Sequence, residues 1–193
     1  SRYTYDAFHN YLNERSEKIE VLNGFFEALL QIFSNYQRVD RITLPLIKTI
    51  GDLLSASAVL DVVLEADDGY SIRLLTLLKK ECMRCSDYHK LSATITVLCE
   101  LLRIEGNTTK ACLTQLALFL GFQYPKVRAV TATSLLTALQ DYSDRPIVPE
   151  ENLDEIIGVL EETEWMANMD VARKQRNRLS ELIGIPVPQV KKK

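Results

Sequence analysis

The sequence is poor in the residues that interrupt regular structure, with only 7 glycines and 6 prolines among 193 residues. Such a composition excludes collagen-like and low-complexity chains, and the 47% of hydrophobic residues is not that of a disordered segment. The glycines are isolated, so the sequence has no glycine-rich loop of the kind that cradles phosphates. The chain is long and apolar enough to bury a core as one domain or as one array of repeats.

A long hydrophobic run is also missing. No apolar stretch approaches the roughly 20 residues that a helix needs to cross a bilayer, and no basic segment followed by an apolar one marks a signal peptide. The chain begins at Ser1-Arg2 without an initiator methionine. We therefore expect a fragment of a longer protein with no membrane span, in which case targeting signals would lie outside the fragment.

Charge of one sign does not dominate the sequence, which has 23 basic and 26 acidic residues and a net charge of −3. The one run of like charge is Lys191-Lys192-Lys193, which we interpret as a frayed tail. Without a broad basic surface, nucleic acid is not an expected partner.

Cysteine and histidine, the residues that most often carry catalysis or metals, are few. The cysteines are Cys82, Cys85, Cys99 and Cys112. They continue apolar faces, which indicates reduced thiols in a cytosolic protein. Cys82, Cys85 and His89 could begin a zinc site, but no second ligand pair follows at the standard spacing, so a structural role is favoured. We predict no catalytic residue, no metal site, no bound cofactor and no enzymatic activity of the chain itself.

Apolar residues recur at helical spacing along most of the chain, and nothing alternates with a period of two, so we predict helices and no sheet. The helices are expected over residues 5–12, 19–36, 40–54, 74–85, 87–106, 107–121, 125–139, 153–160 and 171–183. Asp40 is expected to cap a helix that holds Pro45 in its first turn, because an interior proline loses a backbone bond. Asp87 and Asn107 are further expected N-caps, and Gly121 an expected stop.

The helices fall into pairs whose starts, near Tyr70, Asn107 and Glu151, recur at roughly the 40-residue period of HEAT or armadillo repeats. The predicted fold class is all-α, an α-solenoid of about four antiparallel HEAT/armadillo-like helix pairs. A rounded, non-repetitive helix bundle is the alternative. We interpret residues 1–193 as a single helical-repeat domain, with residues 1–15 as an N-terminal extension and 185–193 as a tail.

The helix that begins at Pro125 contains an unusual charge. Pro125 suits a first turn, because its missing N–H would have no intrahelical partner there. A helical wheel places Arg128 between Leu135 and Leu139, inside the apolar arc. A charge in that position must be paired or bonded to carbonyls. The aspartate that HEAT repeats usually place near this turn is missing, so the partner of Arg128 stays open, with carbonyls at a helix end as one candidate.

Four basic residues stand close together in the last predicted helix. On a helical wheel, Gln175 falls at the centre of the apolar arc, with Arg176 and Arg178 at its edges. We interpret these three as parts of an amphipathic helix whose arginine stems lie along the core, with a backbone partner for Gln175. Arg173 and Lys174 fall outside the arc and are better placed to meet an acidic partner.

Trp165, shortly before this helix, is interpreted as packing at a hinge, with a partner anchor as the alternative. The candidate partner-binding residues are Arg173, Lys174, Arg176, Arg178 and Trp165. The residues with predicted structural roles are Pro125, Arg128 and Gln175.

Three segments, which span most of the chain, resemble one known family in the same order. The most distinctive comprises residues 153–165, Val171-Ala172-Arg173-Lys174-Gln175-Arg176-Asn177-Arg178-Leu179 and residues 182–189; the others are residues 41–49 and 127–144. They are similar to the C-terminal end of tubulin-folding cofactor D.

The resemblance implies a portion of a much longer HEAT/armadillo-type protein that acts after the chaperonin. The family binds β-tubulin and, with cofactors E and C and an ARF-like small GTPase, assembles or dismantles the α/β-tubulin heterodimer. With cofactors C and E it also stimulates GTP hydrolysis by tubulin. The resemblance therefore implies a cytoplasmic, microtubule-associated scaffold that supplies a binding surface and no catalytic group. The alternative is a HEAT-type adaptor of an unrelated pathway, for example a transport or phosphatase scaffold.

Overall fold

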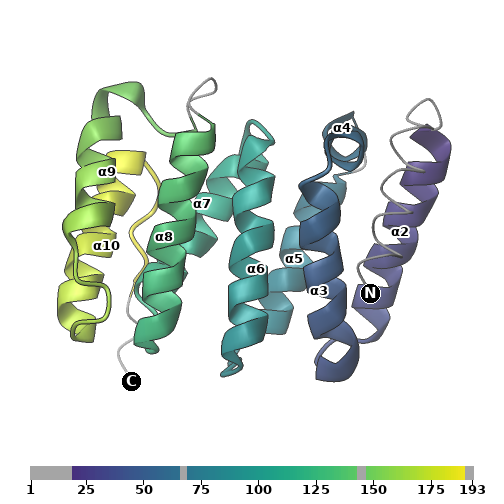
Figure 1. Cartoon of the computed structure of the whole chain (residues 1–193), viewed down its shortest axis with the longest axis horizontal. Coiled ribbons are helices and arrows are strands. Elements are labelled where there is room, and N and C mark those ends of the chain that lie inside the picture. The colour runs from purple at the N-terminus through teal and green to yellow at the C-terminus, as the bar shows by residue number, and fades with distance from the viewer. Residues whose placement is uncertain (1–18, 66–68, 143–146, 190–193) are drawn as a thin grey trace. The chain divides into compact units, whose positions relative to one another are not determined.

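The computed structural model describes residues 19–65, 69–142 and 147–189 (Figure 1). Within these ranges the backbone forms α-helices joined by short connections, with two short 3-10 helices and no strand. This all-α architecture confirms the predicted fold class, an α-solenoid of helix pairs, whereas the number of pairs stays a prediction. The helix expected over residues 5–12 lies outside the described part of the chain.

The chain divides into two compact units, Ser1–Cys85 and Ser86–Lys193. The N-terminal unit contains α2 (Ile19–Asn35), α3 (Asp40–Leu54), α4 (Ser57–Glu65) and α5 (Tyr70–Cys82). The C-terminal unit contains α6 (Tyr88–Glu100), α7 (Asn107–Leu120), α8 (Pro125–Asp141), α9 (Leu153–Glu162) and α10 (Met169–Ile183). The single domain expected over residues 1–193 stays a prediction.

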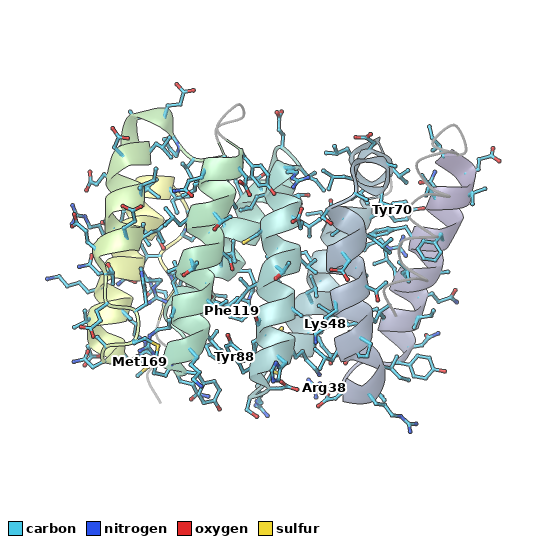
Figure 2. All side chains as sticks on the ribbon, in the orientation of Figure 1. Arg38, Lys48, Tyr70, Tyr88, Phe119 and Met169 are labelled. Atoms are coloured by element: carbon cyan, nitrogen blue, oxygen red, sulfur yellow. The ribbon has the colours of Figure 1, made fainter. Side chains whose placement is uncertain are left out.

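The core of the N-terminal unit is formed by the apolar faces of α2, α3, α4 and α5, which contact one another. The buried stripe of α2 consists of Leu22, Phe26, Leu29, Leu30 and Phe33. The ring of Phe26 meets that of Tyr70 edge to face, with 5.5 Å between ring centroids (Figure 2). This contact joins α2 to the first turn of α5.

A buried carboxylate, that of Glu81 in α5, ties this core to the turn between α2 and α3. Glu81 is 2% exposed. One of its oxygens accepts a hydrogen bond from the Arg38 backbone N–H at 2.7 Å, and the other accepts one from the Thr43 hydroxyl at 2.7 Å. Arg38 has a positive φ of 64°, so the carboxylate holds the chain in a sharp, left-handed turn directly before α3.

The start of α3 differs from the prediction. Its N-cap is Val39 and not Asp40, and Pro45 lies inside the helix and not in its first turn. An interior proline removes one backbone hydrogen bond and costs about 3 kcal/mol. The buried stripe that contains Leu46, Ile50 and Leu54 offsets this loss, because each side chain packs into the core of the unit.

Helix α4 was not predicted at all, and α5 ends three residues earlier than predicted. The β-branched residues Val59, Val62 and Val63 have low helix propensity, but all three are buried, so packing overrides propensity. Helix α5 ends at Cys82, and Arg84 after it has a positive φ of 61°. Cys85, which was expected on the same helical face, therefore lies beyond the helix.

In the C-terminal unit the expected signals at helix ends are confirmed in three cases out of five. The Asp87 carboxylate caps α6 by accepting hydrogen bonds from two backbone N–H groups, Pro125 occupies the first turn of α8, and Gly121 is the C-cap of α7. Two expected signals are wrong. Asn107 is the first residue of α7, whose N-cap is Gly106. Helix α6 ends at Glu100 and is followed by a 3-10 turn, so it does not extend to Gly106.

Helix α10 starts two residues earlier than predicted, because Asn168 caps it. The Asn168 side chain accepts hydrogen bonds from the backbone N–H groups of Asp170 at 3.1 Å and Val171 at 3.0 Å. The helix ends at Gly184, which has a positive φ of 78°. Helix α10 packs against both α7 and α9, while α8 packs against α6, α7 and α9. Arg173 and Arg176 of α10 are thereby brought to Gly121, at the turn between α7 and α8.

Candidate functional site

Arg128, in the first turn of α8, is one of the most deeply buried side chains, with 1% of its surface exposed. Its Nε donates to the Trp165 carbonyl at 2.9 Å, and Nη1 donates to the Phe122 carbonyl at 2.8 Å. Nη2 donates to the Ala167 carbonyl. These bonds make the burial of the charge tolerable, since an unpaired guanidinium would be very costly at this depth. The partner that the sequence left open is thus a set of backbone carbonyls.

Those carbonyls belong to two connections that are far apart in the sequence. Phe122 follows α7, whereas Trp165 and Ala167 lie between α9 and α10. The Trp165 ring is 5% exposed, and its indole N–H donates to the Leu160 carbonyl at 2.9 Å. Trp165 therefore packs inside the connection between α9 and α10. Its two interpreted roles, packing at a hinge and anchoring a partner, stay predictions.

Arg176 of α10 is the second buried arginine, with 4% exposure. The helical wheel placed Arg176 at the edge of the apolar arc. However, α10 contacts α7 as well as α9, and the contact with the end of α7 covers this side chain. Its Nε donates to the Asn177 side-chain oxygen at 2.8 Å, and Nη2 lies 3.4 Å from the Pro188 carbonyl. Partner contact through Arg176, which the sequence kept open, is therefore restricted to its Nη1, which has no hydrogen-bond partner among the described residues.

The side chain of Arg176 passes directly over Gly121, at the end of α7. A Cβ atom added to Gly121 would lie 2.7 Å from Nη1 of Arg176 and 3.5 Å from Cγ of Arg173. Only a residue without a side chain leaves room for this approach. Gly121 therefore ends α7 and also leaves room for the close approach of two arginine side chains of α10.

Arg173 completes a cluster of three arginines around the turn that follows α7. Burial lowers the pKa of the Arg128 guanidinium, and the positive charge of Arg173 lowers it further. Burial and then Arg173 lower the pKa of Arg176 in the same way. Arg173 is itself half-buried. We call Arg128, Arg173 and Arg176 the arginine cluster.

No carboxylate neutralises the arginine cluster within the described part of the chain. The hydrogen bonds of Arg128 all go to carbonyls, and those of Arg176 go to an amide oxygen and a carbonyl. Arg173 forms no hydrogen bond or ion pair with any described residue. Asp170 lies one turn earlier on α10 but is exposed and forms no ion pair with Arg173. Among the described residues, three positive charges thus share one site with no carboxylate paired to them.

The remaining basic residues of α10 have ordinary surface positions. Arg178 forms an ion pair with Glu155 at 2.6 Å, in which the two side chains are 55% and 48% exposed. Such an exposed ion pair contributes little to the stability of the fold, because water screens the attraction between the two charges. Lys174 is exposed, and Gln175, expected at the centre of the apolar arc, is half-buried.

Sequence reasoning selected Arg128, Arg173 and Arg176 separately but did not bring them together, and it missed Gly121 as their seat. The glycine was interpreted only as a helix stop. A glycine at a helix end carries no signal about what approaches it from a helix some 50 residues later. The contact between α7 and α10 is the information that was lacking.

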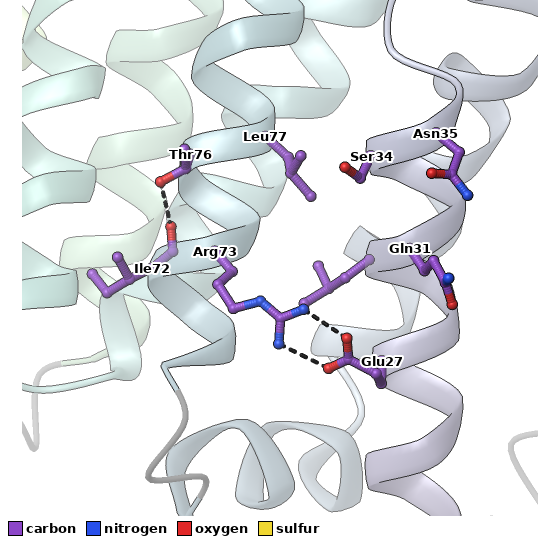
Figure 3. Close-up of a pocket in the computed structure, with 9 residues that line it drawn as sticks. Glu27, Gln31, Ser34, Asn35, Ile72, Arg73, Thr76 and Leu77 are labelled. Carbon is purple, nitrogen blue, oxygen red and sulfur yellow. Dashed lines mark hydrogen bonds and ion pairs between the residues drawn. The ribbon is translucent and has the colours of Figure 1, made fainter.

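A second feature, in the N-terminal unit, is an open groove between α2 and α5 (Figure 3). The Arg73 guanidinium spans it and binds both oxygens of the Glu27 carboxylate, at 2.8 and 2.6 Å. This hydrogen bond is the main reason why the pKa of Glu27 lies below its ordinary value. The rest of the groove is lined by Leu30, Gln31, Ser34, Asn35, Ile72, Thr76 and Leu77. The groove carries no catalytic arrangement, because its two charged groups neutralise each other.

Most of the cysteines lie in the protein interior. Cys82, Cys99 and Cys112 are buried, and Cys85 is half-buried. Burial raises the pKa of the Cys99 thiol to about 12, so it is protonated at neutral pH. Among the described residues, no group of three or more side chains is arranged to hold a metal ion. None of the helices described is both long enough and apolar enough to span a bilayer.

A protein-family model described as tubulin folding cofactor D C terminal matches residues 1–90. The match covers the N-terminal unit and the first residues of α6. The similar segment 41–49 lies inside the match, whereas the segments 127–144 and 153–189 lie beyond it. No solved structure matches this chain. The resemblance to tubulin-folding cofactor D is therefore confirmed over residues 1–90.

Proposed function

We propose that this chain is the scaffold part of a tubulin-folding cofactor and that the protein carrying it binds β-tubulin. The single observation that carries the proposal is the family match over residues 1–90. The all-α architecture supports it, since helical-repeat proteins use extended surfaces to hold large partners. A tubulin chaperone works in the cytoplasm, in association with microtubules.

The proposed partners are β-tubulin, tubulin-folding cofactors E and C, and an ARF-like small GTPase. With them, the whole protein would assemble or dismantle the α/β-tubulin heterodimer and promote GTP hydrolysis by tubulin. We propose no catalytic group in this chain. Its exposed cations on α10, Lys174 above all, together with half-buried Arg173, would meet acidic surface of a partner.

A binding assay with purified components tests the proposal. The chain is immobilised and incubated separately with α/β-tubulin, cofactor E, cofactor C and the ARF-like GTPase. We expect retention of tubulin or of one cofactor, and no GTP hydrolysis by the chain alone. If none of the four is retained, and the full-length protein also fails to co-purify with β-tubulin under conditions that preserve cofactor E binding, the proposal is wrong.

The alternative, a HEAT-type adaptor of an unrelated pathway, is kept because the family match ends at residue 90. Helices α7 to α10 lie beyond it. The two functions differ in whether the chain binds tubulin, and we expect the tubulin-binding surface in the N-terminal unit because the family match lies there. Loss of tubulin binding on changing exposed residues of α2 or α5 would favour the cofactor, and a chain that captures only non-tubulin proteins would favour the adaptor.

A further inference from the structure

The arginine cluster brings three positive charges together, two of them on buried side chains. Nη1 of Arg128 donates to the Phe122 carbonyl, one residue after Gly121, and the side chains of Arg173 and Arg176 both lie against Gly121. Buried charges are normally paired, because the attraction must offset the loss of hydration. A site where three guanidinium groups meet no carboxylate of the described ranges departs from that rule.

The three arginines differ in what they still have to offer a ligand. Arg128 already uses Nε, Nη1 and Nη2 on carbonyls. Arg176 uses Nε fully and Nη2 weakly, while its Nη1 has no hydrogen-bond partner among the described residues. Arg173 uses no donor on any described residue and is half-buried, so it is reachable from solvent. The donors available for a ligand are therefore those of Arg173 and Nη1 of Arg176.

We propose that Arg173 and Arg176, seated on Gly121, form a binding site for carboxylate side chains of an acidic protein segment. A planar guanidinium matches a carboxylate with two parallel hydrogen bonds, and a ligand carboxylate would neutralise the repulsion within the cluster. Two exposed lysines, Lys126 in the first turn of α8 and Lys174 beside Arg173, extend the positive charge.

The surroundings favour an acidic protein segment over a nucleic acid. Tyr124, which is 37% exposed, stands at the same turn and contacts the ring of Phe122 with 5.6 Å between centroids. A phenol can donate to a carboxylate and pack against apolar side chains of a peptide. The whole chain has a net charge of −3 and is not a basic protein, whereas a nucleic acid is held mainly by many phosphate contacts to an extended basic surface.

The site also predicts a conflict between stability and binding. Arg173 repels the two buried arginines in the unbound protein, so its removal should relieve strain. The same removal takes away the most accessible donor of the site. An ordinary solvent-exposed arginine would show neither effect, so the two readouts together distinguish a built anion site from a merely basic surface.

The test uses the full chain and a fluorescein-labelled peptide of ten glutamates, titrated by fluorescence anisotropy at low and at physiological salt. Arg173→Gln is compared with Arg178→Gln, which removes the same charge from the same helix. We expect Arg173→Gln to weaken binding about tenfold or more and to raise the melting temperature by about 2–4 °C. Arg178→Gln should change affinity by less than about twofold.

Three results would overturn the inference. The first is unchanged peptide affinity in Arg173→Gln, and the second is an equal loss in Arg178→Gln, which would mean charge attraction without a site. The third is tighter binding of inorganic phosphate than of the peptide at equal concentration, which would reassign the site to phosphate ligands. The inference rests on the proposed scaffold function only in naming a protein partner. The peptide titration contains no tubulin, so it can succeed or fail independently of the tubulin pull-down.

Discussion

At the scale of single residues, Arg128 combines 1% exposure with hydrogen bonds to carbonyls of two separate connections. Its charge serves the fold and not a ligand, because no described carboxylate or solvent-facing donor is associated with it. Arg173 and Arg176 form fewer hydrogen bonds with described residues than Arg128 does, so they keep donors that a ligand could use. Three arginines within one site therefore divide into one structural residue and two residues with donors to spare.

Replacing Arg128 by methionine should destabilise the protein by about 2–4 kcal/mol, because carbonyls of Phe122, Trp165 and Ala167 lose their donor inside the core. Urea unfolding followed by circular dichroism measures the change. The matched control is Arg178→Met, whose exposed ion pair with Glu155 is worth about 1 kcal/mol or less. Equal effects in the two variants would contradict the structural role of Arg128.

Gly121→Ala should also destabilise, by about 1–3 kcal/mol, because the new methyl group would stand 2.7 Å from Nη1 of buried Arg176. Gly158→Ala is the control. Gly158 lies inside α9, and nothing would lie within 4 Å of its added Cβ, so alanine should stabilise by about 0.5–1 kcal/mol. Thermal unfolding of the two variants checks the opposite signs, and a stabilised Gly121→Ala would mean that Arg176 moves aside at no cost.

At the scale of helices, the ion pair of Glu27 and Arg73 links α2 to α5 across an open groove (Figure 3). Because Arg73 lowers the pKa of Glu27, the folded state holds the carboxylate in its charged form more strongly than the unfolded chain does. The side chains of Arg73 and Glu27 are 45% and 44% exposed, so the contribution is at most about 1 kcal/mol.

The pH dependence of this contribution has a definite sign. It is fully present above the ordinary carboxyl pKa of 4.5 and is lost as the pH falls through the lowered value of the folded state. Glu27→Gln removes the titrating group, so the wild type should exceed the variant in stability at pH 7, and the difference should shrink towards pH 3. Urea unfolding at both pH values measures it. A difference that grows on acidification would show that the pair does not act as described.

The helices themselves were largely predictable, because most of their signals are local. The Asp87 cap, the start of α8 at Pro125 and the stop at Gly121 depend on the backbone groups of one helix end, and all three were correct. The predictions of helices were wrong where contacts with distant parts of the chain determine whether a helix forms. Helix α4 forms because its valines are buried, and Pro45 is tolerated because α3 has a strong apolar stripe.

At the scale of the whole molecule, the burial of the cysteines gives a simple prediction. Cys85 is half-buried and should react with a thiol reagent in the folded protein, whereas Cys82, Cys99 and Cys112 should react only after unfolding. Burial also raises the pKa of Cys99 to about 12, which suppresses its thiolate. Mass spectrometry after brief iodoacetamide treatment should find one label natively and four in urea. Cys85→Ser should abolish native labelling, and native labelling of Cys99 would contradict the described packing.

The sequence alone determined the helical class, most helix boundaries and the resemblance to tubulin-folding cofactor D. Helical periodicity, caps and segment similarity are properties of neighbouring residues, so they can be inferred without a fold. Only the tertiary structure decided which of the charged residues of α10 are buried. A helical wheel assumes one buried face, but α10 contacts both α7 and α9, so Arg176 is covered while Gln175 is only half-buried. The arginine cluster exists because these helices bring Arg128, Arg173 and Arg176 to Gly121, and contacts between segments so far apart leave no local trace in the sequence.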